Sequence, residues 1–220
     1  MHHATCDAIP QLSQPRRGYR FSGDAVALAE FAKASATETV LDLCSGCGVV
    51  PILMWQRSPF RHAVGVELDA ELSALARNNV AEFRLDDKIT MVQADVRSLR
   101  TVHLQGTHPF EKSIRFDVIT ANPPYWPAHH GRLNPNAQKA VARHEISLTL
   151  AEVLAAARRF LKPGGRFYLS HLESRQDEIL ARLTRDTLAV CRVQQVSGLA
   201  GRMLFEAHLQ QGPNARHEPR

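Results

Sequence analysis

Residues 39–48 read Thr-Val-Leu-Asp-Leu-Cys-Ser-Gly-Cys-Gly, a short apolar run followed by a turn that contains two glycines. The run predicts a buried strand over Thr39–Leu43, and the residues after the turn predict a short helix over Val49–Arg57. Ligands of open α/β sheets bind at the carboxyl ends of the strands, and glycine lets the backbone approach a ligand closely. The stretch therefore predicts an α/β sheet with a nucleotide-like cofactor at this turn.

Hydrophobic runs and amphipathic stretches continue to alternate along the chain, as they do in α/β sheets. Further strands are predicted over residues 62–67, 89–93, 115–121, 166–170, 191–196 and 203–209. The helices predicted between them include one capped by Asp69, one over 176–187, and one that carries Leu150, Leu154, Ala157 and Leu161 on one face and stops at residues 162–165. Residues 97–113 show no clear pattern. The predicted fold is a mostly parallel, Rossmann-like sheet with helices on both faces.

The composition is that of one globular domain. The chain has 220 residues, of which 44% are apolar and 22% charged, and it contains no internal repeat or linker. A single domain over residues 1–210 and a polar tail over 211–220 are therefore predicted. The longest apolar run, Val49–Trp55, is much shorter than the roughly 20 residues that span a bilayer, and the amino terminus lacks the pattern of a secretion signal. We expect a cytoplasmic protein without a membrane partner.

Three carboxylates at predicted strand ends indicate the cofactor. Glu67 ends the second strand, 19 positions after Gly48, where a carboxylate can accept hydrogen bonds from both hydroxyls of a ribose. NAD-binding turns have a small residue where this chain has Pro51, so a dinucleotide is disfavoured. Asp95, after the third strand, suits an adenine amino group, and Asp42, just before the turn, suits an amino-acid ammonium. A cationic adenosyl cofactor, S-adenosylmethionine, satisfies all three.

The most specific motif is Asn122-Pro123-Pro124-Tyr125, directly after the fourth predicted strand. A planar amino group is a poor nucleophile because its lone pair is delocalised. The Asn122 side-chain oxygen and the Pro123 carbonyl can both accept hydrogen bonds from such a group and direct its lone pair at the sulfonium methyl. The prolines restrict the backbone, and Tyr125 offers a ring for stacking. The motif predicts methyl transfer to a planar amine.

With these motifs in view, the chain resembles class I S-adenosylmethionine-dependent methyltransferases of the Asn-Pro-Pro-Tyr type. Residues 18–25, 142–145 and 202–205 make it similar to the bacterial tRNA1(Val) adenine-37 N6-methyltransferase family over about residues 14–209. The resemblance implies a seven-stranded sheet, with residues 20–24 closing over the methionine end of the cofactor. It implies that the cofactor is held by Asp42, Gly46, Gly48, Glu67 and Asp95, and the target adenine by Asn122 and Tyr125.

The turn departs from that family in carrying Cys44 and Cys47, where relatives often have small residues. A Cys-x-x-Cys pair could form half of a metal or redox site. The chain has no second such pair, and its four cysteines are too few and too scattered for a disulfide framework. We therefore expect free thiols and no metal.

The acceptor is predicted from charge. Lys and Arg number 27 against 22 Asp and Glu, which gives a net charge of +5 and favours a polyanionic partner. Residues 118–144 contain no Asp or Glu. Basic side chains beside aromatic rings can contact phosphates and stack on bases. The predicted substrate-binding residues are Trp126, Arg132, Lys139 and Arg143. An adenine in RNA, most plausibly in a tRNA loop, is the predicted substrate, and no obligate protein partner is evident.

Three alternatives remain open. A glutamine side-chain amide is also a planar NH2, and protein glutamine N5-methyltransferases of the release-factor type share the core motifs. Those enzymes usually carry an amino-terminal helical domain, whereas about 38 residues precede the first predicted strand here. A DNA adenine is a second possible acceptor. A non-catalytic RNA-binding module that keeps the methyltransferase scaffold is the third, although the cofactor and base motifs are intact.

Overall fold

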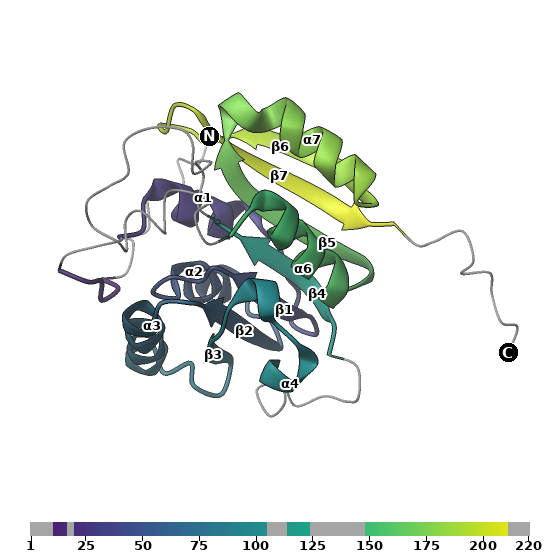
Figure 1. The fold of residues 1–220 in the computed structure, drawn as a ribbon. Helices are drawn as coiled ribbons and strands as arrows, with labels where there is room; N and C mark the ends of the chain where they lie inside the picture. The colour runs from purple at the N-terminus through teal and green to yellow at the C-terminus, as the bar shows by residue number, and fades with distance from the viewer. Residues whose placement is uncertain (1–10, 17–19, 105–113, 124–147, 211–220) are drawn as a thin grey trace, which may run out of the picture.

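The computed structural model describes residues 11–16, 20–104, 114–123 and 148–210, and these form one seven-stranded sheet in the order β3-β2-β1-β4-β5-β7-β6 (Figure 1). The strands are β1 Thr39–Leu43, β2 His62–Glu67, β3 Ile89–Gln93, β4 Phe116–Ala121, β5 Leu161–Leu172, β6 Leu188–Gln195 and β7 Arg202–Leu209. The first five pair in parallel, and β7 is antiparallel to both β5 and β6. The predicted fold class is confirmed.

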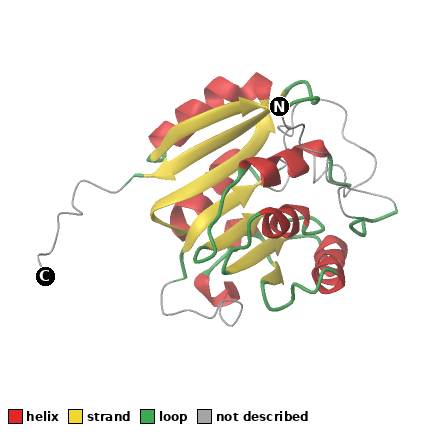
Figure 2. Cartoon of the chain, turned by 180° about the vertical axis from the view of Figure 1, so that it is seen from behind, coloured by secondary structure: helices red, strands yellow, loops and turns green. Residues whose placement is uncertain are grey.

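Helices cover both faces of the sheet (Figure 1 and Figure 2). The helices are α1 Gly23–Phe31, α2 Val49–Arg57, α3 Ala70–Glu82, α4 Thr101–Leu104, α6 Leu150–Phe160 and α7 Gln176–Arg185, with 3-10 turns η1 Val96–Ser98 and η2 Glu173–Arg175. Alternate strand residues face two separate apolar clusters: Val40 packs with α1, α2 and α3, whereas Leu41 packs with α4, α6 and α7. None of the described helices is long and apolar enough to cross a bilayer.

The first half of the described sheet follows the sequence expectations closely. The boundaries of β1, α2, β2 and β3 are those predicted. Asp69 caps α3 as expected, because its carboxylate accepts a hydrogen bond from the Leu72 N–H at 2.9 Å. Each of these elements lies between sharp turn signals, so local sequence defines both ends.

Several elements differ from expectation. Strand β6, predicted over 191–196, is Leu188–Gln195; strand β5, predicted over 166–170, is Leu161–Leu172; and the helix predicted over 176–187 is α7, Gln176–Arg185. Leu161 begins β5 instead of ending α6, and residues 162–165 form an irregularity inside that strand, where the register with β4 shifts between Phe116 and Val118. Helix α1 was not predicted at all. Of its five buried residues only Leu28 and Phe31 have large apolar side chains, so the stripe of such residues that indicates a helix is short.

Arg192 of β6 joins helix α1 to the carboxyl-terminal strands of the sheet. The guanidinium lies 3.7 Å from the centre of the Phe31 ring, donates a hydrogen bond to the Phe31 carbonyl at 2.9 Å, and pairs with Glu206 at 2.9 Å. Phe31 also meets the Tyr168 ring edge-on, with the ring centres 5.9 Å apart. These contacts hold the segment that leads into β1 against β5, β6 and β7.

Candidate active site

The carboxyl ends of β1, β2, β3 and β4 meet at one edge of the sheet. In the parallel register Asp42 lies beside Gly65 of β2 and Thr120 of β4. The order of the sheet reverses between β1 and β4, which is the position where ligands of doubly wound sheets bind. Asp42, Glu67 and Asn122 therefore belong to one edge, together with Asp95, which follows β3.

The turn after β1 depends on backbone conformations that favour glycine. Cys44, Gly46 and Gly48 have φ angles of 62°, 56° and 82°. Gly48 is the N-cap residue of α2 and has the left-handed conformation, and a Cβ atom there would lie 3.4 Å from the Ala76 side chain. Cys44 adopts the same region with a side chain, which is uncommon and costs conformational energy. The N–H groups of Ser45, Gly46 and Gly48 are bound within the protein, to the Val66 carbonyl, the Glu67 carboxylate and the Ser45 carbonyl.

Glu67 connects the end of β2 to this turn. One carboxylate oxygen accepts a hydrogen bond from the Gly46 N–H at 2.8 Å, and the other accepts one from the Asp69 N–H at 2.9 Å. Burial raises the pKa of Glu67, and these two backbone donors oppose the rise. The next side chain, Leu68, is one of the few exposed large apolar groups, at 43% exposure. The Glu67 carboxylate is thus fixed where it can accept hydrogen bonds from ribose hydroxyls, and Leu68 offers an apolar surface to the attached base.

Asp42 is 1% exposed and binds two hydroxyl groups. Ser45 Oγ donates to one carboxylate oxygen at 2.7 Å, and Thr120 Oγ1 donates to the other at 2.6 Å. Burial raises the pKa of Asp42 to about 7, although both hydroxyls lower it. Thr120 lies two residues before Asn122, so Asp42 links the glycine turn to the end of the strand that carries Asn122.

Asp95 follows β3 and caps η1. Its carboxylate accepts hydrogen bonds from the Arg97 backbone N–H at 2.9 Å and from the Arg97 guanidinium at 2.5 to 3.0 Å. The Arg97 side chain holds the pKa of Asp95 below its usual value. The carboxylate is therefore ionised at neutral pH, at the edge where the sequence predicts contact with an adenine.

Asn122 and Pro123 follow β4 at the same edge, with Asn122 partly buried and Pro123 buried. Tyr125 and the predicted substrate residues Trp126, Arg132, Lys139 and Arg143 lie outside the described residues. Their roles stay predictions.

Sequence reasoning missed Asn79, a fully buried side chain on α3. Its amide nitrogen donates to the Cys47 carbonyl at 2.8 Å and to the Ser13 carbonyl at 3.0 Å, and its amide oxygen accepts from the Ser13 N–H at 2.8 Å. Asn79 therefore joins the glycine turn to residues 11–16. A polar residue on the apolar face of a predicted helix is the signal that could have identified it.

The segment joined in this way carries a second overlooked side chain. The amide oxygen of Gln14 is buried and has no hydrogen-bond partner among the described residues. Buried polar atoms normally have a partner, so one without a partner is a candidate ligand contact. Arg20 donates a hydrogen bond to the Pro15 carbonyl at 3.4 Å. It lies close enough to the turn for its charge to lower the pKa of Cys47, although burial raises that pKa by more.

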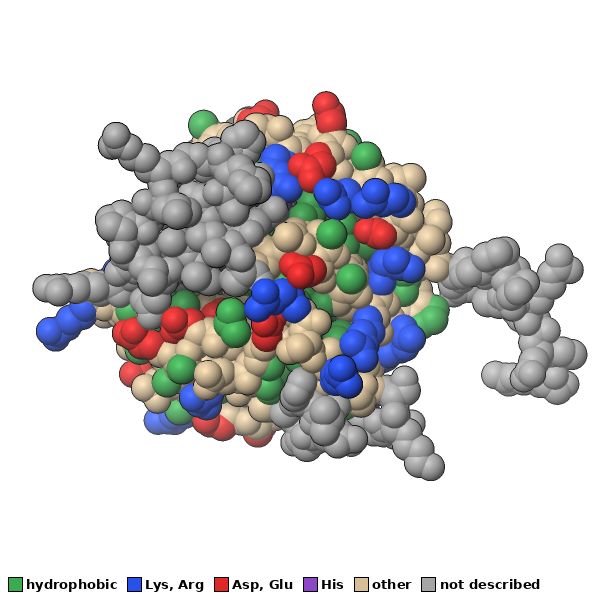
Figure 3. Space-filling model, viewed as in Figure 1, with side chains coloured by type: hydrophobic (Ala, Val, Ile, Leu, Met, Phe, Trp, Pro, Cys, Tyr) green, Lys and Arg blue, Asp and Glu red, His purple; other side chains and the backbone are tan. Residues whose placement is uncertain are grey.

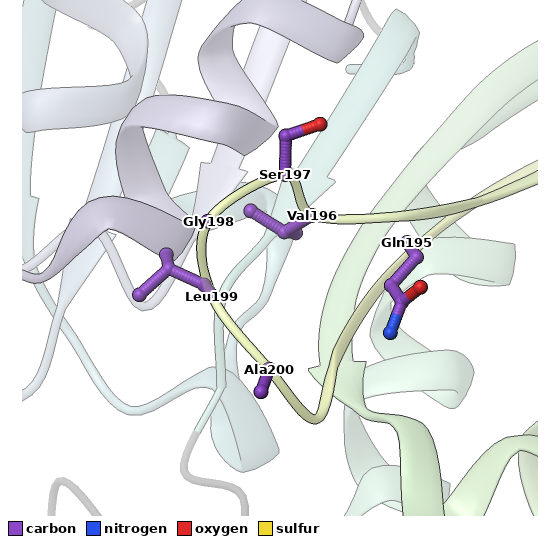
Figure 4. A pocket seen from close by; sticks show the side chains of 6 residues that line it. All are labelled: Gln195, Val196, Ser197, Gly198, Leu199 and Ala200. Atoms are coloured by element: carbon purple, nitrogen blue, oxygen red, sulfur yellow. The ribbon is translucent and has the colours of Figure 1, made fainter.

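The start of α1 lies at this edge too. The carboxylate of Asp24, which is buried, accepts a hydrogen bond from Ser22 Oγ at 2.6 Å and pairs with Arg202 at 3.4 Å. A hollow of about 410 Å³ is lined by residues 195–200, in the loop between β6 and β7 (Figure 4). Leu199 of that loop packs against Gly23, where a Cβ atom would lie 2.7 Å from it. Strand β7 and the loop before it therefore contact Asp24 and Gly23. These two residues belong to segment 20–24, which the family resemblance places over the methionine end of the cofactor.

Burial lowers the reactivity of the two thiols at the turn, because it disfavours the thiolate form. Burial raises the pKa of Cys44 well above its ordinary value and that of Cys47 to about 11. Both are free thiols and stay protonated at neutral pH. In the part of the chain that the structure describes, no group of three or more His, Cys, Asp or Glu side chains is arranged to hold a metal.

Gly65 makes room for Ser45, which leads to a first prediction. A Cβ atom at Gly65 would lie 2.6 Å from Ser45 Oγ and 2.5 Å from the Met91 methyl. We expect Gly65→Ala to destabilise the fold by about 1–3 kcal/mol, the usual effect of overpacking, as measured by urea unfolding. If the clash with Ser45 is the cause, adding Ser45→Ala will recover part of the loss in a double-mutant cycle. Strict additivity would show that Met91 alone is responsible.

The raised pKa of Asp42 gives a pH dependence. In an unfolded chain this carboxyl ionises near pH 4, so between about pH 4 and 7 the folded protein keeps a proton that the unfolded chain has released. The contribution of Asp42 to stability therefore falls as the pH rises through this window. We expect Asp42→Asn to be more stable, relative to the wild type, at pH 8 than at pH 5.

Urea unfolding at both pH values measures this difference. His171, whose pKa burial lowers to about 3, contributes equally to both proteins and cancels in the comparison. A difference in unfolding free energy that does not change with pH would mean that Asp42 is ionised throughout.

Comparisons with known proteins found relatives in sequence and in fold. Two curated relatives are tRNA1(Val) (adenine(37)-N6)-methyltransferases. The one from Dyadobacter fermentans is 32% identical over 144 residues, which are 66% of this chain and 55% of that protein. The one from Aeromonas hydrophila is 30% identical over 170 residues, or 76% of this chain and 66% of that protein. The chain thus matches only about half to two thirds of the length of these relatives.

Solved structures match at the level of the fold. A methyltransferase from Pyrococcus furiosus superposes with a TM-score of 0.63 at 17% identity, over 91% of this chain and 89% of that one. The tRNA m1G37 methyltransferase of M. jannaschii gives a TM-score of 0.60 at 12% identity, over 86% of this chain and 49% of that one.

The family model described as "Methyltransferase small domain" matches residues 22–195, which include the glycine turn, Glu67, Asp95 and Asn122. The resemblance that the motifs indicated is confirmed at this level. The chain belongs to the methyltransferase small domain family.

Proposed function

We propose that this protein transfers a methyl group from S-adenosylmethionine to the exocyclic N6 amine of an adenine in RNA, and that the RNA is a tRNA. The observation that carries the proposal is the junction of the Asn122-Pro123 pair with the glycine turn through Thr120 and Asp42. The names of the relatives support the choice of substrate, because the relatives are named for adenine 37 of a tRNA.

The residues at the edge of the sheet fit the proposed cofactor. Glu67 suits the ribose, since both of its oxygens are fixed by backbone donors and keep further lone pairs. Asp42 has a neighbouring Glu67 and two hydroxyls but no described cationic partner, so a cationic ligand would complete its surroundings. The buried amide oxygen of Gln14 suits an ammonium donor. When bound, S-adenosylmethionine supplies a methyl group on a positively charged sulfur.

The reaction needs an amine nitrogen with an available lone pair. Two acceptors at fixed positions, the Asn122 side-chain oxygen and the Pro123 carbonyl, would bind the two N–H bonds of the adenine amine and weaken its conjugation with the ring. Pro123 is buried, and its ring restricts the φ angle of the residue that carries this carbonyl. Amide oxygens are weak bases, so the proton that the nitrogen loses passes to solvent.

The remaining parts of the substrate site are proposed from sequence. Tyr125 and Trp126 would stack on the adenine or its neighbour, and Arg132, Lys139 and Arg143 would contact phosphates. An unstacked base is needed because a base inside a helix does not expose its amine to such a pocket.

A methylation assay tests the function. Purified protein is incubated with labelled S-adenosylmethionine and, in parallel, with total tRNA, a release factor or duplex DNA, followed by nucleoside mass spectrometry. We expect N6-methyladenosine in tRNA, and loss of turnover by at least a hundredfold in Asn122→Ala with cofactor binding retained. Asn78→Ala, an exposed asparagine on α3, is the matched control.

Each other outcome has a meaning. Label on the release factor alone would replace the RNA substrate with a protein glutamine, and label on duplex DNA alone would replace it with a DNA adenine. Transfer to no acceptor, with intact RNA binding, would favour a non-catalytic binding module. Turnover of Asn122→Ala within a few fold of the wild type would remove Asn122 from the catalytic residues.

Gln14 gives an independent test of the cofactor site. We expect Gln14→Leu to weaken the binding of S-adenosylhomocysteine about fivefold, which corresponds to about 1 kcal/mol for one lost hydrogen bond. Stability in urea should stay equal or rise, because the buried oxygen that is removed has no partner in the described protein. Calorimetric titration, with Gln56→Leu on the exposed side of α2 as control, measures the effect. Unchanged affinity would exclude Gln14 from the cofactor site.

A further inference from the structure

Asn79 of α3 is a polar side chain in the interior of the protein. Many charged side chains lie on the surface, as those of Lys, Arg, Asp and Glu do on the face shown in Figure 3, whereas Asn79 is 0% exposed. Burial of an amide costs free energy unless its N–H and C=O groups are hydrogen-bonded. The partners of Asn79 therefore show which parts of the chain this side chain holds together.

These partners belong to two segments that are far from α3 in sequence. The amide nitrogen of Asn79 donates to the Cys47 carbonyl in the glycine turn at 2.8 Å and to the Ser13 carbonyl at 3.0 Å. The amide oxygen accepts from the Ser13 N–H at 2.8 Å. A side-chain amide has two N–H donors, so both are used. An apolar or acidic side chain at this position could not donate to either carbonyl.

The two bonds to Ser13 fix the chain on both sides of that residue. The Ser13 N–H belongs to the peptide group before it, and the Ser13 carbonyl belongs to the peptide group that leads to Gln14. Gln14 precedes Pro15, and the residue before a proline is restricted to extended conformations. Pro15 is buried, and Leu12 is buried in the apolar cluster of α1, α2 and α3. Residues 12–15 are thus held around Gln14, although they form no helix or strand.

Gln14 carries the acceptor that this arrangement leaves unsatisfied. Its buried amide oxygen has no hydrogen-bond partner among the described residues. An apolar side chain of similar shape would occupy the same space without that cost, so packing alone does not explain the amide. A carbonyl oxygen accepts only from a donor such as N–H or O–H. The unsatisfied oxygen therefore points to a ligand with such a donor.

The amino-acid end of the proposed cofactor offers this kind of donor. Cys47, which Asn79 binds, is next to Gly46, whose N–H donates to the Glu67 carboxylate. The segment around Gln14 is therefore joined to the turn that the proposed function places at the cofactor. An ammonium group has three N–H donors and no acceptor. Binding to Asp42 leaves it donors for a second acceptor.

We propose that Asn79 is a positioning residue of the cofactor site, and this inference rests on the proposed function. Its three hydrogen bonds hold residues 12–15 against the glycine turn, and the amide oxygen of Gln14 then accepts a hydrogen bond from the ammonium group of S-adenosylmethionine. Asn79 acts on the cofactor through Gln14. A contact that is fixed before the ligand arrives loses less conformational entropy on binding.

A double-mutant cycle tests the coupling between the two residues. Gln14→Leu, Asn79→Ala and the double variant are compared with the wild type by calorimetric titration with S-adenosylhomocysteine, which carries the same amino-acid group. Gln14→Leu should weaken binding about fivefold, and Asn79→Ala by at least as much, because it releases the segment. In the Asn79→Ala background, Gln14→Leu should change the affinity less than about twofold. A full effect of Gln14→Leu in both backgrounds would overturn the inference.

A second ligand separates positioning from a general loss of structure. 5′-Methylthioadenosine keeps the adenosine part of the cofactor and lacks the amino-acid group. Its affinity should stay within about twofold of the wild type in all three variants. A distorted glycine turn would instead weaken both ligands equally, and that result would make Asn79 a structural residue only.

Leu12→Ala keeps the test informative if Asn79→Ala does not fold. Leu12 anchors the same segment in the apolar cluster, so its truncation should also weaken binding of S-adenosylhomocysteine and reduce the effect of Gln14→Leu. Val80→Ala is the matched control, because Val80 is next to Asn79 on α3 and is buried in the same cluster. The control should lower the urea midpoint and keep the full effect of Gln14→Leu. An equal loss of that effect in the control would contradict the inference.

Kinetics separate the inference from the proposed function. Asn79→Ala should raise the KM for S-adenosylmethionine and leave kcat within about twofold, as expected for the loss of a binding contact. A fall in kcat with KM unchanged would count against the inference. Coupled binding in a protein that methylates no acceptor would contradict the proposed function alone. Additive binding effects in an active methyltransferase would contradict the inference alone.

Discussion

A buried carboxylate, that of Asp42, holds the two halves of the candidate site together. Ser45 belongs to the glycine turn and Thr120 to the strand that ends at Asn122, and both hydroxyls bind the same side chain, at 2.7 and 2.6 Å. Burial of a charge is costly unless hydrogen bonds or an opposite charge compensate it. At Asp42 this cost appears as a pKa that burial raises to about 7. These two hydrogen bonds join the turn to the end of β4.

The other fixed points of the site follow the same pattern, in which one polar side chain joins segments that are distant in sequence. Glu67 joins the end of β2 to Gly46, and Asn79 joins α3 to the Cys47 carbonyl and to Ser13. Three strand ends, one helix and the amino-terminal segment thus converge on a turn of five residues. Such preorganisation favours a site that binds a ligand without rearranging its own backbone.

The parts of the fold that depend on interactions between residues close in sequence could be predicted from the sequence. The boundaries of β1, α2, β2 and β3 could be predicted because apolar runs end at glycines or capping residues such as Asp69. The strand-end carboxylates could be placed at one edge, because parallel strands end together. Helix α1 was not predicted, since only Leu28 and Phe31 give its buried face large apolar side chains. The partners of Asp42 and Asn79 could not be predicted either, because they depend on register and packing between segments up to 78 residues apart. Tyr125 and the four predicted substrate residues are outside the described chain.

The sheet separates two apolar clusters that share no residues. Helices α1, α2 and α3 and Leu12 of the amino-terminal segment are built on one cluster, whereas α6 and α7 cover the other, against which Cys44 of the glycine turn also packs. Amino-acid replacements on the exposed side of α6 and α7 therefore leave the packing of α1, α2 and α3 on the other face intact. Over evolutionary time, a lineage of such proteins is able to change one helical layer while the layer on the other face of the sheet is inherited unchanged.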